Sequence, residues 1–158
     1  MLFLLNKGFY VAEKMVMKYL VLILFVIVNS VSAIDNPDAP DYLAEFKQRI
    51  SPLESAIYNK AKTTLAYSEG YEKLNIALDK ELNIAYKKLM LKVAGPHKAK
   101  LRAAQKKWLI YRDAEFRFIN YNFDRSQFGS SSVLTRGGAR ATIVKDRVIT
   151  LLRYLKNY

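Results

Sequence analysis

The sequence predicts an all-α protein, an antiparallel helical hairpin or bundle of about four helices that forms a single domain after a signal peptide. Long segments repeat apolar residues every three or four positions, which is the period of a helix with one buried face. No stretch alternates apolar and polar residues as a half-buried strand does, and there is no internal repeat. Because the chain of 158 residues contains no cysteine, packing alone must hold these helices together.

The first 33 residues are typical of a signal peptide. Lys18 precedes an apolar run at positions 19–28, and positions 31–33 carry the small side chains at which a signal peptidase cleaves. We therefore expect cleavage after Ala33 and export to the periplasm or the extracellular space, with Met17 as an alternative start. The other interpretation is an uncleaved leader that anchors the protein in a membrane, although the run is shorter than the roughly 20 apolar residues of a typical span.

Residues 34–70 are expected to form an N-terminal helical segment. A first short helix is predicted from Asp41 to Ile50. The sequence "SPLE" at 51–54 then predicts a new helix, because serine caps a helix, proline fits its first position and glutamate completes the capping box. We expect a kink or a break at Gly70, where glycine costs about 1 kcal/mol of helix propensity relative to alanine.

Residues 71–158 are expected to form the main helical domain. An apolar stripe along residues 74–89 predicts a core-facing helix that ends at Gly95-Pro96. A long helix follows from about Lys98. The last helix has its apolar stripe along residues 141–155, with basic residues on the opposite side.

Residues 124–140, which are rich in glycine and serine, are predicted to be a loop. Arg136, Gly137, Gly138 and Arg140 would place two cations beside exposed backbone amides just ahead of a helix. Such a combination binds phosphate or carboxylate groups. The alternative is a solvated turn without a ligand.

The chain is strongly basic, with 26 lysines and arginines against 14 acidic residues and a formal net charge of +12. Loss of the leader would leave 23 basic and 13 acidic residues and a charge of +10. This balance favours an anionic partner such as an envelope glycolipid, unless the lysines only solvate long helices. No nucleic-acid-binding motif is present, so we expect no specific nucleic acid partner. Membrane contact is expected only through an uncleaved leader.

Residues suited to catalysis are few. His97 is the only histidine, and its position beside a helix start favours a solvated or capping role. Asp113 and Glu115 are two positions apart on a helix, so they point in different directions. Arg112 can pair with Glu115 or stack on Trp108, which would connect helices at a packed seam. We therefore expect no catalytic residues, no cofactor and no metal.

Two segments carry a recognisable pattern. The first reads Asp-x-x-Leu-Asn-x-x-Tyr, and the second reads Leu-x-x-x-Gln-x-x-Trp-x-x-x-Arg-Asp, beginning at Leu101. The residues that we call the motif residues are Asp79, Leu82, Asn83, Tyr86, Gln105, Trp108, Arg112, Asp113 and Glu115. Together with the sequence around them, from residue 70 to residue 155, they resemble the LprI-type lysozyme-inhibitor-like family of small exported bacterial proteins.

The resemblance implies an exported, non-enzymatic binding protein, with lysozyme or another envelope protein as its partner. It also implies that the motif residues hold two helices together and border a binding surface. Family members usually carry cysteines, and Phe116 stands at one such position here, which implies a cysteine-free variant held by packing. A charge of +10 opposes the approach to a basic animal lysozyme. The alternatives are a basic polyanion-binding protein and a hydrolase that combines Glu115 with Asp79 or Asp113.

Overall fold

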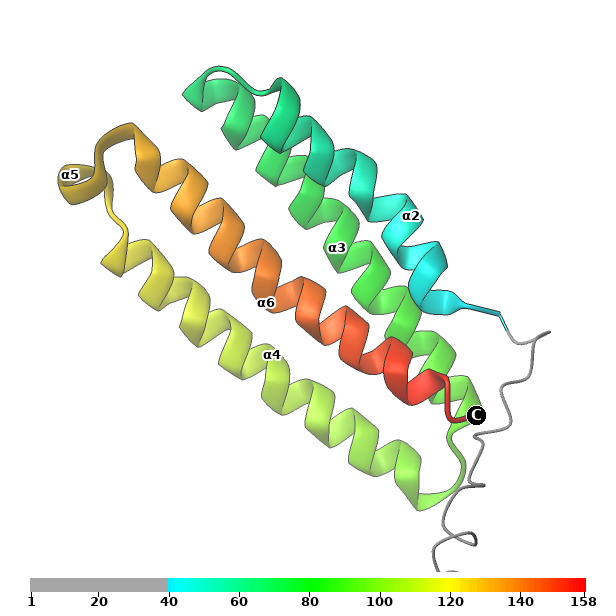
Figure 1. Ribbon diagram of the computed structural model, residues 1–158. Coiled ribbons are helices and arrows are strands. Elements are labelled where there is room, and N and C mark those ends of the chain that lie inside the picture. Colours follow the sequence, from blue (N-terminus) through cyan, green and yellow to red (C-terminus); the bar gives the residue numbers. More distant parts are fainter. Residues whose placement is uncertain (1–39) are drawn as a thin grey trace, which may run out of the picture. The chain divides into compact units, whose positions relative to one another are not determined.

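The computed structural model describes residues 40–158, which are almost entirely helical (Figure 1). The long helices are α2 (Tyr42–Ser55), α3 (Thr64–Lys92), α4 (Pro96–Asn122) and α6 (Ser132–Leu155). A π-helical turn (Ala56–Lys60) follows α2, and a short helix α5 (Arg125–Phe128) with a 3-10 turn (Gly129–Ser131) precedes α6. The all-α prediction is confirmed. The predicted leader lies outside the described residues.

Helix α2 does not stop where the sequence predicted. It continues through the expected boundary at Ser51 and contains Pro52, so the predicted separate helices at 41–50 and from 52 onward were wrong. Asp41 caps it, since its carboxylate accepts hydrogen bonds from two backbone amides at 3.1 and 2.9 Å. Pro52 is exposed, so its ring lies on the solvent side of the helix, and the buried Phe46, Ile50 and Ile57 keep one continuous apolar face.

Helix α3 passes through Gly70 without a break, which corrects the predicted kink. The chain reverses earlier, after Lys60, and Thr63 caps α3 by accepting a hydrogen bond from the Ala66 amide at 3.1 Å. A Cβ atom at Gly70 would lie 2.8 Å from Cγ1 of Ile57. Glycine is therefore present because the preceding turn packs directly on α3, not because the helix ends.

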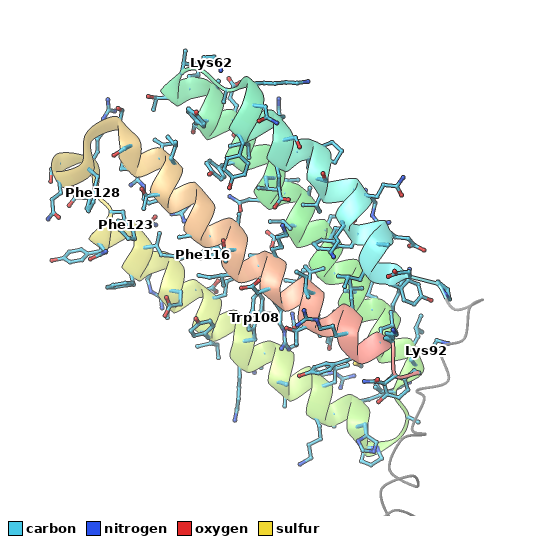
Figure 2. The ribbon with its side chains drawn as sticks, viewed as in Figure 1. Lys62, Lys92, Trp108, Phe116, Phe123 and Phe128 are labelled. Atoms are coloured by element: carbon cyan, nitrogen blue, oxygen red, sulfur yellow. The ribbon has the colours of Figure 1, made fainter. Side chains whose placement is uncertain are left out.

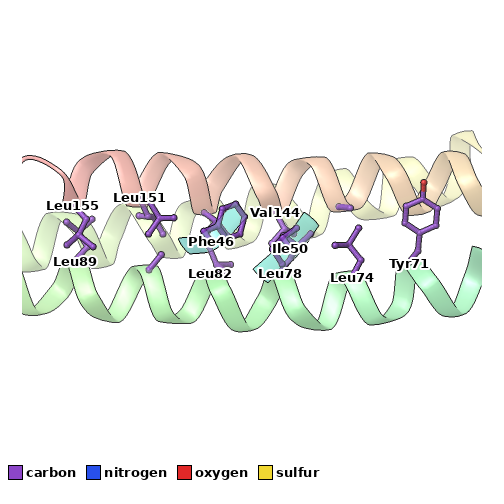
Figure 3. Close-up of a cluster of buried hydrophobic side chains, with 14 of the residues drawn as sticks. Phe46, Ile50, Tyr71, Leu74, Leu78, Leu82, Leu89, Val144, Leu151 and Leu155 are labelled. Atoms are coloured by element: carbon purple, nitrogen blue, oxygen red, sulfur yellow. The ribbon is translucent and has the colours of Figure 1, made fainter. Parts of the chain in front are cut away.

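The core lies along a parallel pair of helices, α3 and α6, which are far apart in sequence (Figure 1). Figure 3 shows Leu89 beside Leu155 at one end of this seam, while Tyr71 occupies the other end. Phe46 and Ile50 of α2 are buried in the same cluster, so α2 covers one side of the pair. One apolar core therefore unites three of the four long helices.

Helix α4 covers the opposite side and packs mainly against α6, which lies between α3 and α4 in Figure 1. Figure 2 shows Trp108 and Phe116 in the space between α4 and α6, and both pack against the core. Only Gln105 and Ile119 of this 27-residue helix are buried. α4 is therefore attached along a narrow face, and much of its surface is exposed. None of the described helices is long and apolar enough to cross a membrane.

Candidate functional site

Two open hollows lie between α3 and the helices that face it. The Asn83 hollow, of about 380 Å³, lies between α3 and α4. The Arg140 hollow, of about 720 Å³, lies between α3 and the first half of α6, with Asn120 of α4 at its edge. Asp79 lines both, so the hollows meet at this residue. The motif residues that line the Asn83 hollow are Asp79, Leu82, Asn83, Tyr86, Gln105 and Arg112.

Arg112 connects α4 to α3 across the Asn83 hollow. Its Nη1 atom lies 3.6 Å from a carboxylate oxygen of Asp79, and its Nη2 atom lies 2.8 Å from Asp113. The guanidinium also lies over the Trp108 ring, 5.8 Å from the ring centroid, as one of the two predicted arrangements requires. The other, pairing with Glu115, is not observed, because Asp113 and Asp79 take the positions around the guanidinium.

Gln105 and Trp108 both contact Arg147 of α6, a residue that was not predicted from the sequence. Arg147 of α6 donates a hydrogen bond from Nε to the buried Gln105 side-chain oxygen at 3.0 Å, and its guanidinium lies 5.7 Å from the Trp108 centroid. Burial lowers the pKa of Arg147. Arg147 lies between the core residues Val144 and Val148, so its position in the apolar stripe was the available signal.

The remaining motif residues divide between core and surface. Leu82 is buried, and Tyr86 packs against the core. Asn83 donates a hydrogen bond to the backbone carbonyl of Asp79 one turn earlier, at 2.9 Å. Glu115 is half-buried, and neither it nor Asp113 lines either hollow. These two hollows therefore do not bring Asp79 together with a second motif carboxylate, as the hydrolase interpretation would require.

The segment predicted to be an anion-binding loop is helical, so its predicted loop conformation was wrong. Arg136, Gly137, Gly138 and Arg140 all belong to α6 and lie beyond its first turn, where backbone amides bond within the helix. A Cβ atom at Gly137 would lie 2.4 Å from Cγ of Tyr71. The glycine thus permits close contact between α6 and α3, and the serine-rich composition misled because a short helix and a 3-10 turn occupy residues 125–131.

The two hollows are predominantly positive. Two carboxylates, Glu72 and Asp79, line the hollows together with five cations. Asp79 already pairs with one of these cations, Arg112. Those cations are Arg102, Lys106, Arg112, Arg136 and Arg140. Such an arrangement is suited to binding an anionic group. Among residues 40–158 no cluster of three or more His, Cys, Asp or Glu side chains is placed to hold a metal ion.

Comparison with protein families agrees with the resemblance noted in the sequence. A family model described as lysozyme inhibitor LprI matches residues 57–151. The match covers more than half of the chain and includes both motif segments, all of α3 and α4, and most of α6. No curated protein and no solved structure matches the chain.

Proposed function

The chain belongs to the LprI family, and on this premise we propose that it is an exported, non-enzymatic protein that acts by binding and inhibiting a lysozyme. The observation that carries the proposal is the family match across the α3, α4 and α6 helices. The signal-peptide pattern of the first 33 residues supports export. The surface that carries the binding must be both accessible and rich in side chains that stabilise protein interfaces.

The outer face of α4, defined by Ile110, Tyr111, Phe118 and Tyr121, meets these conditions. Tyr111, Phe118 and Tyr121 are spaced seven and three positions apart, so they lie on one side of the helix together with Ile110. These four side chains are between 51% and 84% exposed. Tyrosine and other large apolar residues carry much of the binding energy in protein interfaces. A convex helix with such a face suits a concave partner.

The positive charge of α4 supports the proposal that this concave partner is the cleft of a lysozyme. Lys100, Lys107 and Arg117 are exposed along the outer half of α4, next to the apolar side chains. The cleft of a glycosidase contains two carboxyl groups beside the scissile bond. Local attraction between these groups and the α4 cations opposes the long-range repulsion that a basic protein exerts on a basic lysozyme.

The test is a titration of the full-length protein against a basic and an acidic lysozyme at physiological salt, with cell-wall lysis and calorimetric binding as readouts. We expect saturable inhibition, and we expect the double variant Ile110→Ser/Phe118→Ser to bind at least tenfold more weakly with an unchanged melting temperature. Leu91→Ser is the matched control, because Leu91 is an equally apolar side chain, 82% exposed, on α3. If the protein inhibits neither lysozyme, the proposed function is refuted. If the double variant inhibits as well as the unmodified protein, only the assignment of the binding surface to α4 is refuted.

The five cations of the two hollows favour a second candidate function, binding of an anionic envelope glycolipid. In that case binding depends on screened charge attraction, so the affinity should fall steeply as salt rises from about 10 to 150 mM. Vesicles that contain the glycolipid, titrated alongside the lysozymes, separate the two functions. Lysozyme inhibition that persists at physiological salt, without vesicle binding, rejects the glycolipid.

A further inference from the structure

The larger of the two hollows has a feature that lysozyme binding does not explain. Arg136 and Arg140 of α6 form one wall of the Arg140 hollow, and Glu72 and Asn75 of α3 form the other. We infer that this hollow is an oxyanion-binding site in which Arg136 and Arg140 hold one phosphate group. The site is distinct from the outer face of α4 and does not depend on lysozyme inhibition, while it narrows the second candidate function to one of the two hollows and one chemical group.

In the described part of the chain neither arginine forms a close ion pair, although Asp124 is near enough for the charge of Arg136 to help lower the Asp124 pKa, after the hydrogen bonds from Ser126 and Gln127. Arg136 donates only to Ser132, from Nε to the backbone carbonyl at 3.3 Å and from Nη2 to the hydroxyl at 3.4 Å. Arg140 donates to the side-chain oxygen of Asn120, and its guanidinium lies over the Phe116 ring. No carboxylate of residues 40–158 lies within 4.0 Å of either guanidinium.

Two other arginines of this fold are neutralised by carboxylates, whereas the partly buried Arg147 donates to Gln105 and has no carboxylate within 4.0 Å in the described residues. Arg49 forms a two-point contact with Glu81, and Arg112 contacts Asp79 and Asp113. Arg136 and Arg140, one helical turn apart, instead carry like charges on the same side of α6. Burial, and then the neighbouring charge of Arg136, lower the pKa of Arg140. The pair therefore carries an electrostatic cost that Asp124 compensates only at Arg136 and that a bound anion would relieve.

Two polar atoms of the hollow's lining residues add to this cost. The Nε atom of Arg140 and the Oδ1 atom of Asn75 are buried and have no hydrogen-bond partner. A turn of the Arg140 side chain toward the hollow would let a bound anion accept from Nε, and rotation of the Asn75 amide would present its Nδ2 donor in place of Oδ1. Guanidinium groups bind oxyanions through paired, charge-assisted hydrogen bonds.

The geometry favours phosphate and places it on the α6 wall. Two separate guanidinium groups need several acceptor oxygens, which a phosphate supplies and a carboxylate with two oxygens supplies less well. Glu72 and Asp79 on the α3 wall repel an anion, and Asp79 does so less because it contacts Arg112. Free phosphate and the phosphate of a lipid headgroup share this chemistry, so the experiment must separate these two sources.

The test uses the full-length protein and inorganic phosphate, titrated at constant ionic strength against sodium chloride. The readouts are calorimetric binding and the melting temperature. We expect phosphate to bind the unmodified protein with one site and to raise its melting temperature, and we expect Arg136→Gln or Arg140→Gln to weaken binding at least tenfold. Arg153→Gln is the matched control, since Arg153 is exposed on the same helix and carries the same charge.

The second source is tested with vesicles of phosphatidylcholine containing one-fifth phosphatidylglycerol, compared with phosphatidylcholine alone. Binding of either probe that is lost in Arg136→Gln and retained in Arg153→Gln supports the site and identifies its source. An equal response in all three variants, or no binding of either probe, overturns it. If Arg140→Gln does not fold, Arg140→Lys keeps the charge but loses the planar donor pair, and phosphate affinity must still fall.

Discussion

Two glycines set how closely neighbouring segments approach in this protein. Gly70 contacts Ile57 of the preceding turn, and Gly137 contacts the ring of Tyr71. Both lie inside helices, where sequence reasoning predicted a kink and a loop. Helix propensity measures only the cost of a glycine to its own helix, so it does not predict contacts with other segments. A side chain at either position would collide with a residue from another segment, which no local pattern reveals.

Gly137→Ala is therefore expected to destabilise the fold although alanine favours helices. The new Cβ atom would lie 2.4 Å from Cγ of Tyr71, at the base of the ring, so the helices must move apart. We expect a loss of about 1 to 3 kcal/mol in the free energy of unfolding, measured by denaturant titration. Gly138→Ala is the control, because its Cβ atom would meet only the Tyr71 hydroxyl at 3.4 Å. Equal effects of the two changes would contradict this account.

The Tyr71 hydroxyl makes stability fall at high pH. Burial, and then interaction with Tyr58 and Tyr67, raise its pKa from 10.0 to about 12. The unfolded chain therefore loses this proton first, and the stabilisation present below pH 10 decreases as the pH rises to about 12. The slope is at most about 1.4 kcal/mol per pH unit. Unfolding curves at pH 9.5 and 11.5 should differ less for Tyr71→Phe than for the unmodified protein; parallel behaviour would refute the assignment.

At the scale of elements, two ion pairs hold α2 in place beside the core. Arg49 of α2 contacts Glu81 of α3 at 2.6 and 2.9 Å, and Glu81 is almost completely buried. Lys145 of α6 lies 2.6 Å from Glu54 of α2. α2 thus packs its apolar face against α3 and α6, and it forms one ion pair with each of these two helices.

The α2 contact predicts a strong coupling between Arg49 and Glu81. Removal of the arginine leaves a buried carboxylate without its partner, so Arg49→Ala should cost about 1 to 3 kcal/mol of unfolding free energy. Combining it with Glu81→Ala should cost less than the sum of the two single changes in a double-mutant cycle. Glu45→Ala is the control, because its exposed contact with Arg49 at 3.7 Å contributes little. Strict additivity would show that the pair does not interact.

The sequence was sufficient to predict the helices but not their partners. The stripes at 74–89 and 141–155 correspond to the buried faces of α3 and α6, because helical period and burial are linked. Periodicity does not say which stripes meet, and the closest partner of α3 is α6 rather than its sequence neighbour α4. The family resemblance implied that the motif residues connect two helices, but it did not name the Asp79–Arg112 pair, and the role of Arg147 depends on a contact with Gln105, 42 residues away.

At the scale of the whole molecule, the net charge of +12 is unevenly compensated. Ion pairs neutralise the surroundings of α2, while the hollows beside α3 and the outer half of α4 keep unpaired cations. The long-range field is therefore positive, and salt should affect how quickly partners approach more than how long they stay bound.

This distribution predicts opposite salt effects for two partners. With a basic lysozyme, the association rate constant should increase between about 20 and 150 mM salt, because screening reduces repulsion. With an acidic lysozyme, the same change should lower it. Stopped-flow measurement of both rates is the check, and dissociation rates should change little in either case. A basic lysozyme that associates more slowly as salt rises would contradict a repulsive field.

The parallel pairing of α3 and α6 also determines the order in which this protein can fold. Parallel neighbours cannot be joined by a short turn, so all of α4 and α5 must be synthesised before the seam can close. α2 and α3 are neighbours in sequence and can pair before this point, which leaves the leucine stripe of α3 only partly covered until α6 docks. Non-local closure of this kind slows folding relative to a bundle whose sequence neighbours form the core. The growing chain thus presents an apolar surface to other proteins until α6, a helix of 24 residues, has docked.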